Sequence, residues 1–144
     1  MPKEPQIIHF PQGIPGFETL RDFRFIPEEE APIAHLISVK EDQVGFILLR
    51  PEAYFPEYLN EMDVDEESIK PLDVKGDMSV DVWVIITLHR QDMTKTTVNL
   101  RAPVLFNMAN GIGMQVIFND DRYLSRQLLI KEENPQPLEE GVVG

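Results

Sequence analysis

The chain has 144 residues, 42% of them apolar and 26% charged, and its 13 Lys and Arg against 25 Asp and Glu give a formal net charge of −12. This length suits one domain, and the composition is ordinary for a soluble globular protein. So acidic a chain is repelled by nucleic acid and by anionic membranes, and we expect it to bind neither of them directly. It should instead attract basic proteins. Acidity can also simply increase solubility.

The first elements of the chain are a short strand and a tightly turned loop. A β-strand candidate at residues 6–10 leads into the segment FPQGIPGF at residues 10–17, where two prolines and two glycines in eight residues predict defined turns. We expect this loop to pack against the domain and to have a structural role. The residues that shape it are Gly13, Pro15, Gly16 and Phe17. Residues 18–23 then predict one helical turn, and residues 24–26 a short strand.

Two clearer strands follow, at residues 33–39 and 44–49, joined by a connection of hairpin length. The second is apolar on both faces, which is typical of a central strand. In the first, the apolar face is predicted to consist of Ile33, Ile37 and Val39, with His35 in the same register. Pro51 ends this part of the sheet.

An acidic segment, residues 51–69, comes next and contains no Lys or Arg. Its seven carboxylates are Glu52, Glu57, Glu61, Asp63, Asp65, Glu66 and Glu67. The apolar residues between them, which include Tyr54, Phe55 and Tyr58, indicate that the segment is tethered to a core. A short helix is predicted at residues 65–71, because Asp65 suits its N-terminal cap and Pro71 its end.

The later half of the chain has the most regular strand patterns. Apolar residues alternate along residues 80–89 and 96–107, and Asn110-Gly111 predicts a hairpin turn into a strand at residues 114–118. The side of the second strand opposite its apolar face carries Asn99, Arg101 and Pro103. Since proline cannot donate a ladder hydrogen bond, this strand is expected to be an edge or bulged at Pro103.

Seven or eight strands without an internal repeat or linker predict a mainly β fold. We expect a single small antiparallel β-barrel or sandwich with one or two short helices, spanning residues 1–130. Residues 131–144 have two prolines, four glutamates and no apolar period, which predicts a disordered acidic tail.

The sequence contains no recognisable catalytic, metal-binding or cofactor-binding pattern. His9, His35 and His89 lie in three different strand candidates without a partner at ligand or triad spacing, and they are interpreted as strand histidines satisfied by their neighbours. The chain has no cysteine, which excludes a cysteine nucleophile and fits a reducing compartment. Residues 1–6 lead into no apolar core of a signal peptide. We therefore expect a cytoplasmic binding protein that is not an enzyme and has no metal or cofactor.

Three motifs occur in order: FPQGIPGF at residues 10–17, TTVNLRAPV at residues 96–104 and GMQVI at residues 113–117. On these motifs the chain resembles the flagellar assembly factor FliW family, roughly over residues 7–126. The resemblance implies a compact β-barrel-like fold without catalytic activity. It also implies two partners: the RNA-binding translational regulator CsrA, whose repression of flagellin translation the family prevents, and newly made flagellin.

Two surfaces are candidates for partner binding. The favoured one is the acidic segment, with its seven carboxylates and with Tyr54, Phe55 and Tyr58, because carboxylates beside an RNA-binding surface repel phosphates within a Debye length, roughly 8 Å at physiological salt. The other is the late edge strand with Asn99, Arg101 and Pro103, which would offer pairing groups, although a proline also protects an edge. An acidic nucleic-acid mimic and a small-ligand-binding β-barrel remain as alternative functions.

Overall fold

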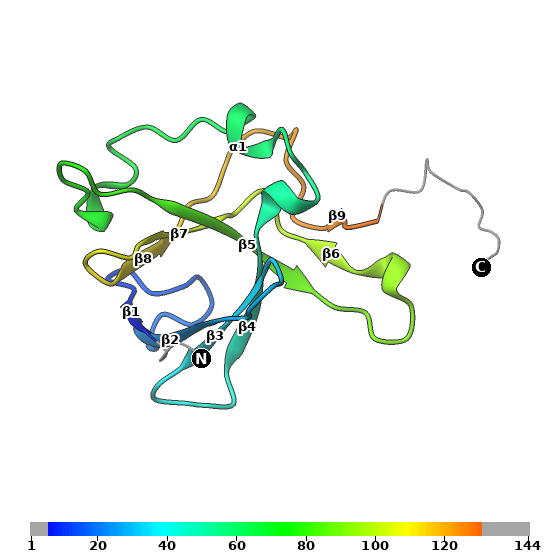
Figure 1. Ribbon diagram of the computed structural model, residues 1–144, viewed down its shortest axis with the longest axis horizontal. Coiled ribbons are helices and arrows are strands. Elements are labelled where there is room, and N and C mark those ends of the chain that lie inside the picture. The colour runs from blue at the N-terminus through cyan, green and yellow to red at the C-terminus, as the bar shows by residue number, and fades with distance from the viewer. Residues whose placement is uncertain (1–5, 131–144) are drawn as a thin grey trace.

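The computed structural model describes residues 6–130, in which nine strands form one sheet that closes on itself (Figure 1). The strands are β1 (Gln6–His9), β2 (Asp22–Pro27), β3 (Ile33–Ser38), β4 (Gly45–Leu49), β5 (Asp81–Thr87), β6 (Thr97–Val98), β7 (Val104–Asn107), β8 (Ile112–Gln115) and β9 (Gln127–Leu128). The helical elements are η1 (Pro51–Ala53), α1 (Tyr58–Glu61), η2 (Lys70–Leu72) and η3 (Met93–Lys95). The tail predicted at residues 131–144 lies outside the described residues.

Seven of the strands form a closed barrel in the order β4-β3-β2-β1-β8-β7-β5, and the pairing of β5 with β4 completes the ring. β6 and β9 extend the sheet from the far end of β5. Every pairing is antiparallel except that of β1 with β8, where His9 faces Ile112 and the His9 amide donates to the Gly111 carbonyl oxygen at 2.8 Å. The prediction of a mainly β barrel is thus confirmed, with one parallel contact that the sequence pattern did not indicate.

Aromatic rings fill the barrel interior. The ring centroid of Phe10 lies 5.4 Å from that of Phe23, and the centroid of Phe25 lies 5.1 Å from Phe106 and 5.5 Å from Trp83. All five side chains are buried. Edge-to-face and tilted packing of this kind gives the core a large apolar area in a specific geometry.

The inner face of β3 is not the face that carries its larger β-branched residues. Ala34, Leu36 and Ser38 are buried, whereas Ile33 and Ile37 are half-buried and Val39 is exposed. Ile33, His35 and Ile37 share one face, as predicted, but it is the outer face, where Ile33 packs against the cluster that contains Tyr58. Ala34 and Leu36 pack inward in the cluster that contains the phenylalanine rings of the neighbouring strands.

The loop at residues 10–17 has the tight turns that its composition predicts. Ile14 and Phe17 bridge across Pro15 and Gly16, with the Phe17 amide donating to the Ile14 carbonyl oxygen at 2.7 Å. Ile14 is buried, and the ring of Phe17 packs edge-on against that of Phe46 at 5.4 Å. The loop is therefore part of the packed structure.

Gly13 is expected to tolerate no side chain in this loop. Its φ is +72°, and a Cβ atom there would lie 2.8 Å from the backbone Cα of Glu18, so Gly13→Ala combines a left-handed backbone with a steric clash. We expect the free energy of unfolding to fall by about 2–3 kcal/mol, measured by urea denaturation. Gly16→Ala is the control: Gly16 has φ +89° with nothing within 4 Å of its Cβ position, so the loss should be about 1 kcal/mol. Equal losses in the two variants would contradict this account.

The helix predicted at residues 65–71 is absent from the structure. The α-helical turn, α1, lies earlier, at Tyr58–Glu61, and residues 65–69 form turns that lead into η2. Asp65 still behaves as a cap, since its Oδ1 accepts the Ser68 amide at 2.8 Å. Too few residues separate this cap from Pro71 to propagate a helix. The helical turn predicted at residues 18–23 was also wrong, because β2 begins at Asp22.

The late strand predicted at residues 96–107 is interrupted. Asn99 Oδ1 accepts the amides of Arg101 at 3.1 Å and of Ala102 at 3.0 Å, which turns the chain between β6 and β7. A short polar side chain competes in this way with the strand ladder. The expected bulge at Pro103 is thus a full break of the strand, and the turn predicted at Asn110-Gly111 is confirmed, with Gly111 at φ +74°.

Candidate functional site

The acidic segment crosses one side of the barrel between β4 and β5 and is drawn in cyan and green near the top of Figure 1. All seven of its carboxylate side chains are exposed. Among the described residues, only Lys70 forms an ion pair with any of them, to Glu67 at 3.5 Å. The segment therefore presents a surface of nearly uncompensated negative charge, as the sequence predicted.

Tyr58 anchors this segment to the barrel. Its side chain is buried, and its hydroxyl donates to the Leu100 carbonyl oxygen at 2.7 Å. Its ring meets that of Tyr123 edge-on at a centroid distance of 5.5 Å. Of the three aromatic residues predicted to contact a partner, Tyr54 is exposed and Phe55 half-buried, but Tyr58 belongs to the core.

Tyr58→Phe is expected to lower the free energy of unfolding by about 1 kcal/mol at pH 7, because the Leu100 carbonyl oxygen loses its donor. Burial, and then the neighbouring Tyr123, raise the pKa of the Tyr58 hydroxyl. The unfolded tyrosine ionises near pH 10, so this hydroxyl favours folding below that pH and its contribution is lost as the pH rises further. The difference in the free energy of unfolding between wild type and Tyr58→Phe should therefore be smaller at pH 10.5 than at pH 7. Urea denaturation at both pH values measures it, and an unchanged difference would contradict the assignment.

A groove of about 440 Å³ lies beside α1, between the acidic segment and the chain that follows β8. The lining residues are Phe55, Pro56, Glu57, Tyr58, Glu61, Leu100, Arg122 and Tyr123. The floor is aromatic and aliphatic, and the rim carries the charged groups. Its volume falls in the range of ligand-sized pockets, roughly 300–1,000 Å³.

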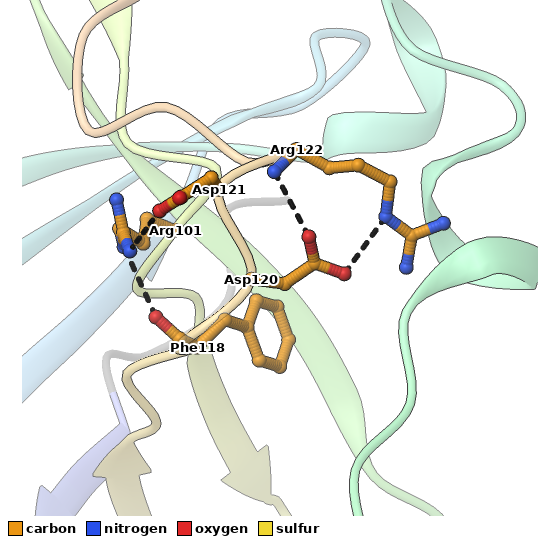
Figure 2. Close-up of polar contacts among 5 residues, drawn as sticks. All are labelled: Arg101, Phe118, Asp120, Asp121 and Arg122. Atoms are coloured by element: carbon orange, nitrogen blue, oxygen red, sulfur yellow. Dashed lines mark hydrogen bonds and ion pairs between the residues drawn. The ribbon is translucent and has the colours of Figure 1, made fainter.

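The wall opposite α1 is held by two arginines (Figure 2). Arg122 Nε donates to Asp120 Oδ2 at 2.9 Å, and its guanidinium lies 4.9 Å from the centre of the Tyr123 ring. Arg101 donates to the Phe118 carbonyl oxygen and to Asp121 Oδ1, both at 3.0 Å. These bonds fix the loop that carries Tyr123.

Asp120 has a lowered pKa in this wall. The Arg122 backbone amide donates to Asp120 Oδ1 at 2.9 Å and is the main cause. Desolvation opposes it, and the Arg122 guanidinium lowers the pKa further. The carboxylate therefore stays ionised over the physiological range. Arg122 consequently has a matched negative partner on its own loop.

The second predicted surface is not an open strand edge. Pro103 is buried, and its carbonyl oxygen accepts the Val116 amide at 3.0 Å. Asn99 and Arg101 are half-buried and bond within the turn and the Phe118 loop. The interrupted strand uses these pairing groups internally, so the expected open edge is absent, and contact of these three residues with a partner stays a prediction.

Sequence reasoning missed the groove residues that lie outside the acidic segment. Leu100, Arg122 and Tyr123 are about 40–65 positions from α1 and meet it only through the closure of the barrel, a non-local contact of the kind that sequence patterns do not encode. Leu100 lies inside the TTVNLRAPV motif, which is the one signal that marked this region.

The three histidines lie apart, and each is bonded locally. His9 Nδ1 lies 2.8 Å from Asp22 Oδ1, and His35 Nε2 lies 2.7 Å from Glu28 Oε2. His89 Nδ1 accepts the Asp92 amide at 3.1 Å. All three are satisfied by neighbours, as interpreted, but His89 lies just beyond β5 and is not a strand residue. Across residues 6–130, no three His, Asp or Glu side chains are grouped closely enough to hold a metal ion. In the same part of the chain, no helix has the length and apolar character that crossing a membrane requires.

Comparisons with known proteins agree with this architecture. The family model described as "FliW protein" matches residues 2–129. The flagellar assembly factor FliW of Geobacillus thermodenitrificans (strain NG80-2) is 36% identical over 130 residues, which cover 90% of this chain and 88% of the relative. That of Bacillus pumilus (strain SAFR-032) is 41% identical over 128 residues, covering 88% and 87%.

A solved structure shows the same fold. The crystal structure of a flagellar assembly factor FliW superposes with a TM-score of 0.79 at 35% identity, covering 89% of this chain and 88% of the other. Sequence and fold agree over almost the whole of the described region. The chain therefore belongs to the FliW family of flagellar assembly factors.

Proposed function

We propose that this protein is a cytoplasmic, non-catalytic flagellar assembly factor that binds the translational regulator CsrA and relieves its repression of flagellin mRNA. Flagellin is its second partner and competes with the regulator, so that export of flagellin frees the protein to act. Membership of the family supports the role in flagellar assembly. The observation that carries the finer proposal is the exposed acidic segment with its seven carboxylates.

The segment suits an inhibitor that acts by charge. An RNA-binding regulator has a positive surface, and carboxylates placed beside it repel RNA phosphates within a Debye length, roughly 8 Å at physiological salt. Inhibition then needs no direct cover of the RNA site. The rigid attachment through Tyr58 keeps these charges at a fixed position, where a free acidic tail would spread them over a large volume.

An electrophoretic mobility-shift assay tests this function directly. Labelled flagellin leader RNA is first bound to purified regulator, and this protein is then added in increasing amounts. We expect the RNA to be released as the protein approaches stoichiometric amounts. RNA that stays bound at saturating protein would contradict the proposal.

Size-exclusion chromatography tests the exchange of partners. Flagellin added to a complex of this protein with the regulator should displace the regulator. A stable complex of all three proteins in one peak would rule out simple competition.

A ligand-binding barrel is less well supported than a protein-binding one. Phe10, Phe23 and Phe106 are fully buried and pack together in the barrel, which is where such proteins hold a ligand. The alternative of an acidic nucleic-acid mimic predicts a stronger dependence of partner binding on salt than our proposal does. A protein that binds its partner by charge alone loses nearly all affinity at high salt.

A further inference from the structure

The groove beside α1 has an apolar floor and an acidic rim. Phe55, Leu100 and Tyr123 form the floor, and Glu57 and Glu61 stand at the edge that faces solvent. This pairing of surfaces is typical of sites where one apolar side chain is buried and charged neighbours set the orientation. A purely solvating acidic surface needs no such floor.

The charge of the rim is only partly offset within the molecule, because Arg122 lies near enough to Glu61 to attract it without forming an ion pair. Arg122 is the one cation among the residues that line the groove, and it is bonded to Asp120 at 2.9 Å. Neither Glu57 nor Glu61 forms an ion pair with another described residue. Two carboxylates therefore remain available to positive groups that approach the groove.

One polar group of the floor lacks a partner. Tyr123 is 5% exposed, and its hydroxyl has no hydrogen-bond partner among the described residues, whereas the adjacent Tyr58 hydroxyl bonds to Leu100. Buried hydroxyl groups are normally satisfied. The Tyr123 hydroxyl is thus an exception within the packed floor, and docking in the groove does not depend on it.

We propose that this groove is the docking site for a basic, amphipathic segment of a partner protein. One apolar side chain of the segment enters between Phe55, Leu100 and Tyr123, and lysines or arginines on either side of it pair with Glu57 and Glu61. The proposal rests on the protein-binding function above and adds to it the chemistry of the contact. The volume of about 440 Å³ fits an anchoring side chain with its flanking backbone.

A titration with synthetic peptides, followed by ¹⁵N–¹H NMR, tests the groove without any natural partner. The probe is acetyl-KKLFKK-amide, and the controls are acetyl-KKAAKK-amide, with equal charge but no anchor, and acetyl-EELFEE-amide, with the anchor but opposite charge. We expect saturable shifts of groove amides, including those of Phe55, Leu100 and Tyr123, with the probe alone. Equal affinity for KKLFKK and KKAAKK, or shifts that map elsewhere, would overturn the proposal.

Matched variants sharpen the test. Phe55→Ala should weaken binding of the probe by about tenfold, and Tyr54→Ala, which removes an exposed aromatic ring that does not line the groove, by less than about twofold. The double variant Glu57→Gln/Glu61→Gln should weaken it by about fivefold, against less than about twofold for Glu66→Gln/Glu67→Gln, which removes the same charge away from the groove. Equal effects within either pair would contradict the site.

These outcomes are separate from the test with the regulator. The glutamine variants keep the size of exposed side chains, so they report on the groove even if Phe55→Ala fails to fold. A probe that binds in the groove of a protein that leaves the regulator on its RNA would contradict the proposed function and leave the docking site standing. A protein that releases the regulator from its RNA but does not bind the probe in the groove would contradict the docking site and leave the proposed function standing.

Discussion

Reversal of Glu57, Glu61, Glu66 and Glu67 to lysine is expected to slow association with a basic partner by on the order of 10²-fold at low salt. Each reversal replaces a negative charge with a positive one and so changes the net charge by +2, which moves the formal net charge from −12 to −4. All four side chains are exposed and only Glu67 forms an ion pair, so the free energy of unfolding should change by no more than about 1 kcal/mol in total. Inhibition of RNA binding by the regulator should be lost with the association.

Surface plasmon resonance at about 50 mM and 500 mM salt measures the effect, which should shrink at the higher salt as screening grows. The matched control reverses Glu29, Glu41, Asp42 and Asp77, which are also exposed but lie outside the acidic segment and the groove. It gives the same net charge and should slow association by only about threefold. Equal losses would show that total charge decides binding, and the acidic nucleic-acid mimic would then be the better description.

Phe106→Ala is expected to lower the free energy of unfolding by about 3–5 kcal/mol. The ring is fully buried, with centroid distances of 5.1 Å to Phe25 and 6.0 Å to Phe10. It faces Gly113 across the β7–β8 pair, and a Cβ atom at Gly113 would lie 2.9 Å from Phe106 Cδ1. The ring thus shares the space beside the glycine with Ile8 and Phe10, whose side chains would lie equally close to that Cβ atom. Its removal creates a cavity lined by these rigid groups.

Urea denaturation measures this loss, and a thermal midpoint lowered by about 10 °C should accompany it. Phe17→Ala is the control, because this ring is 38% exposed and its loss should cost about 1 kcal/mol. A double-mutant cycle tests the pairing: Gly113→Val should cost about 1–3 kcal/mol alone and clearly less when Phe106 is already alanine. Additive losses would contradict the proposed packing.

The sequence predicted the type of fold but not every detail of its strands. Alternation of apolar residues located β5 and the hairpin at Asn110-Gly111, since period and turn chemistry are local. It failed at Asn99, where a side-chain amide ends the strand, and in β3, where Ala34 and Ser38 face the core. In both places the outcome depends on what the rest of the barrel leaves free, which no local pattern contains.

In the candidate site, too, the sequence predicted some features and missed others. Exposure of the acidic residues was predictable, because carboxylates without cationic neighbours stay in water. The role of Tyr58 as an anchor was not, since its acceptor is the carbonyl oxygen of Leu100, 42 residues away. The groove exists only where the acidic segment meets Tyr123 and Arg122, so its position follows from the closed barrel.

Closure of the barrel through β1 and β8 has a consequence for biosynthesis. The two strands meet through the single pair His9 and Ile112, about a hundred residues apart, and such long-range pairing forms late in folding. At ordinary rates of translation, roughly 5–20 s pass between synthesis of β1 and of its partner. During that interval β1 has one unpaired edge, which is open to pairing with other nascent chains. A ribosome that stalls before Ile112 would therefore leave an aggregation-prone chain that needs a chaperone, whereas a finished chain seals the edge itself.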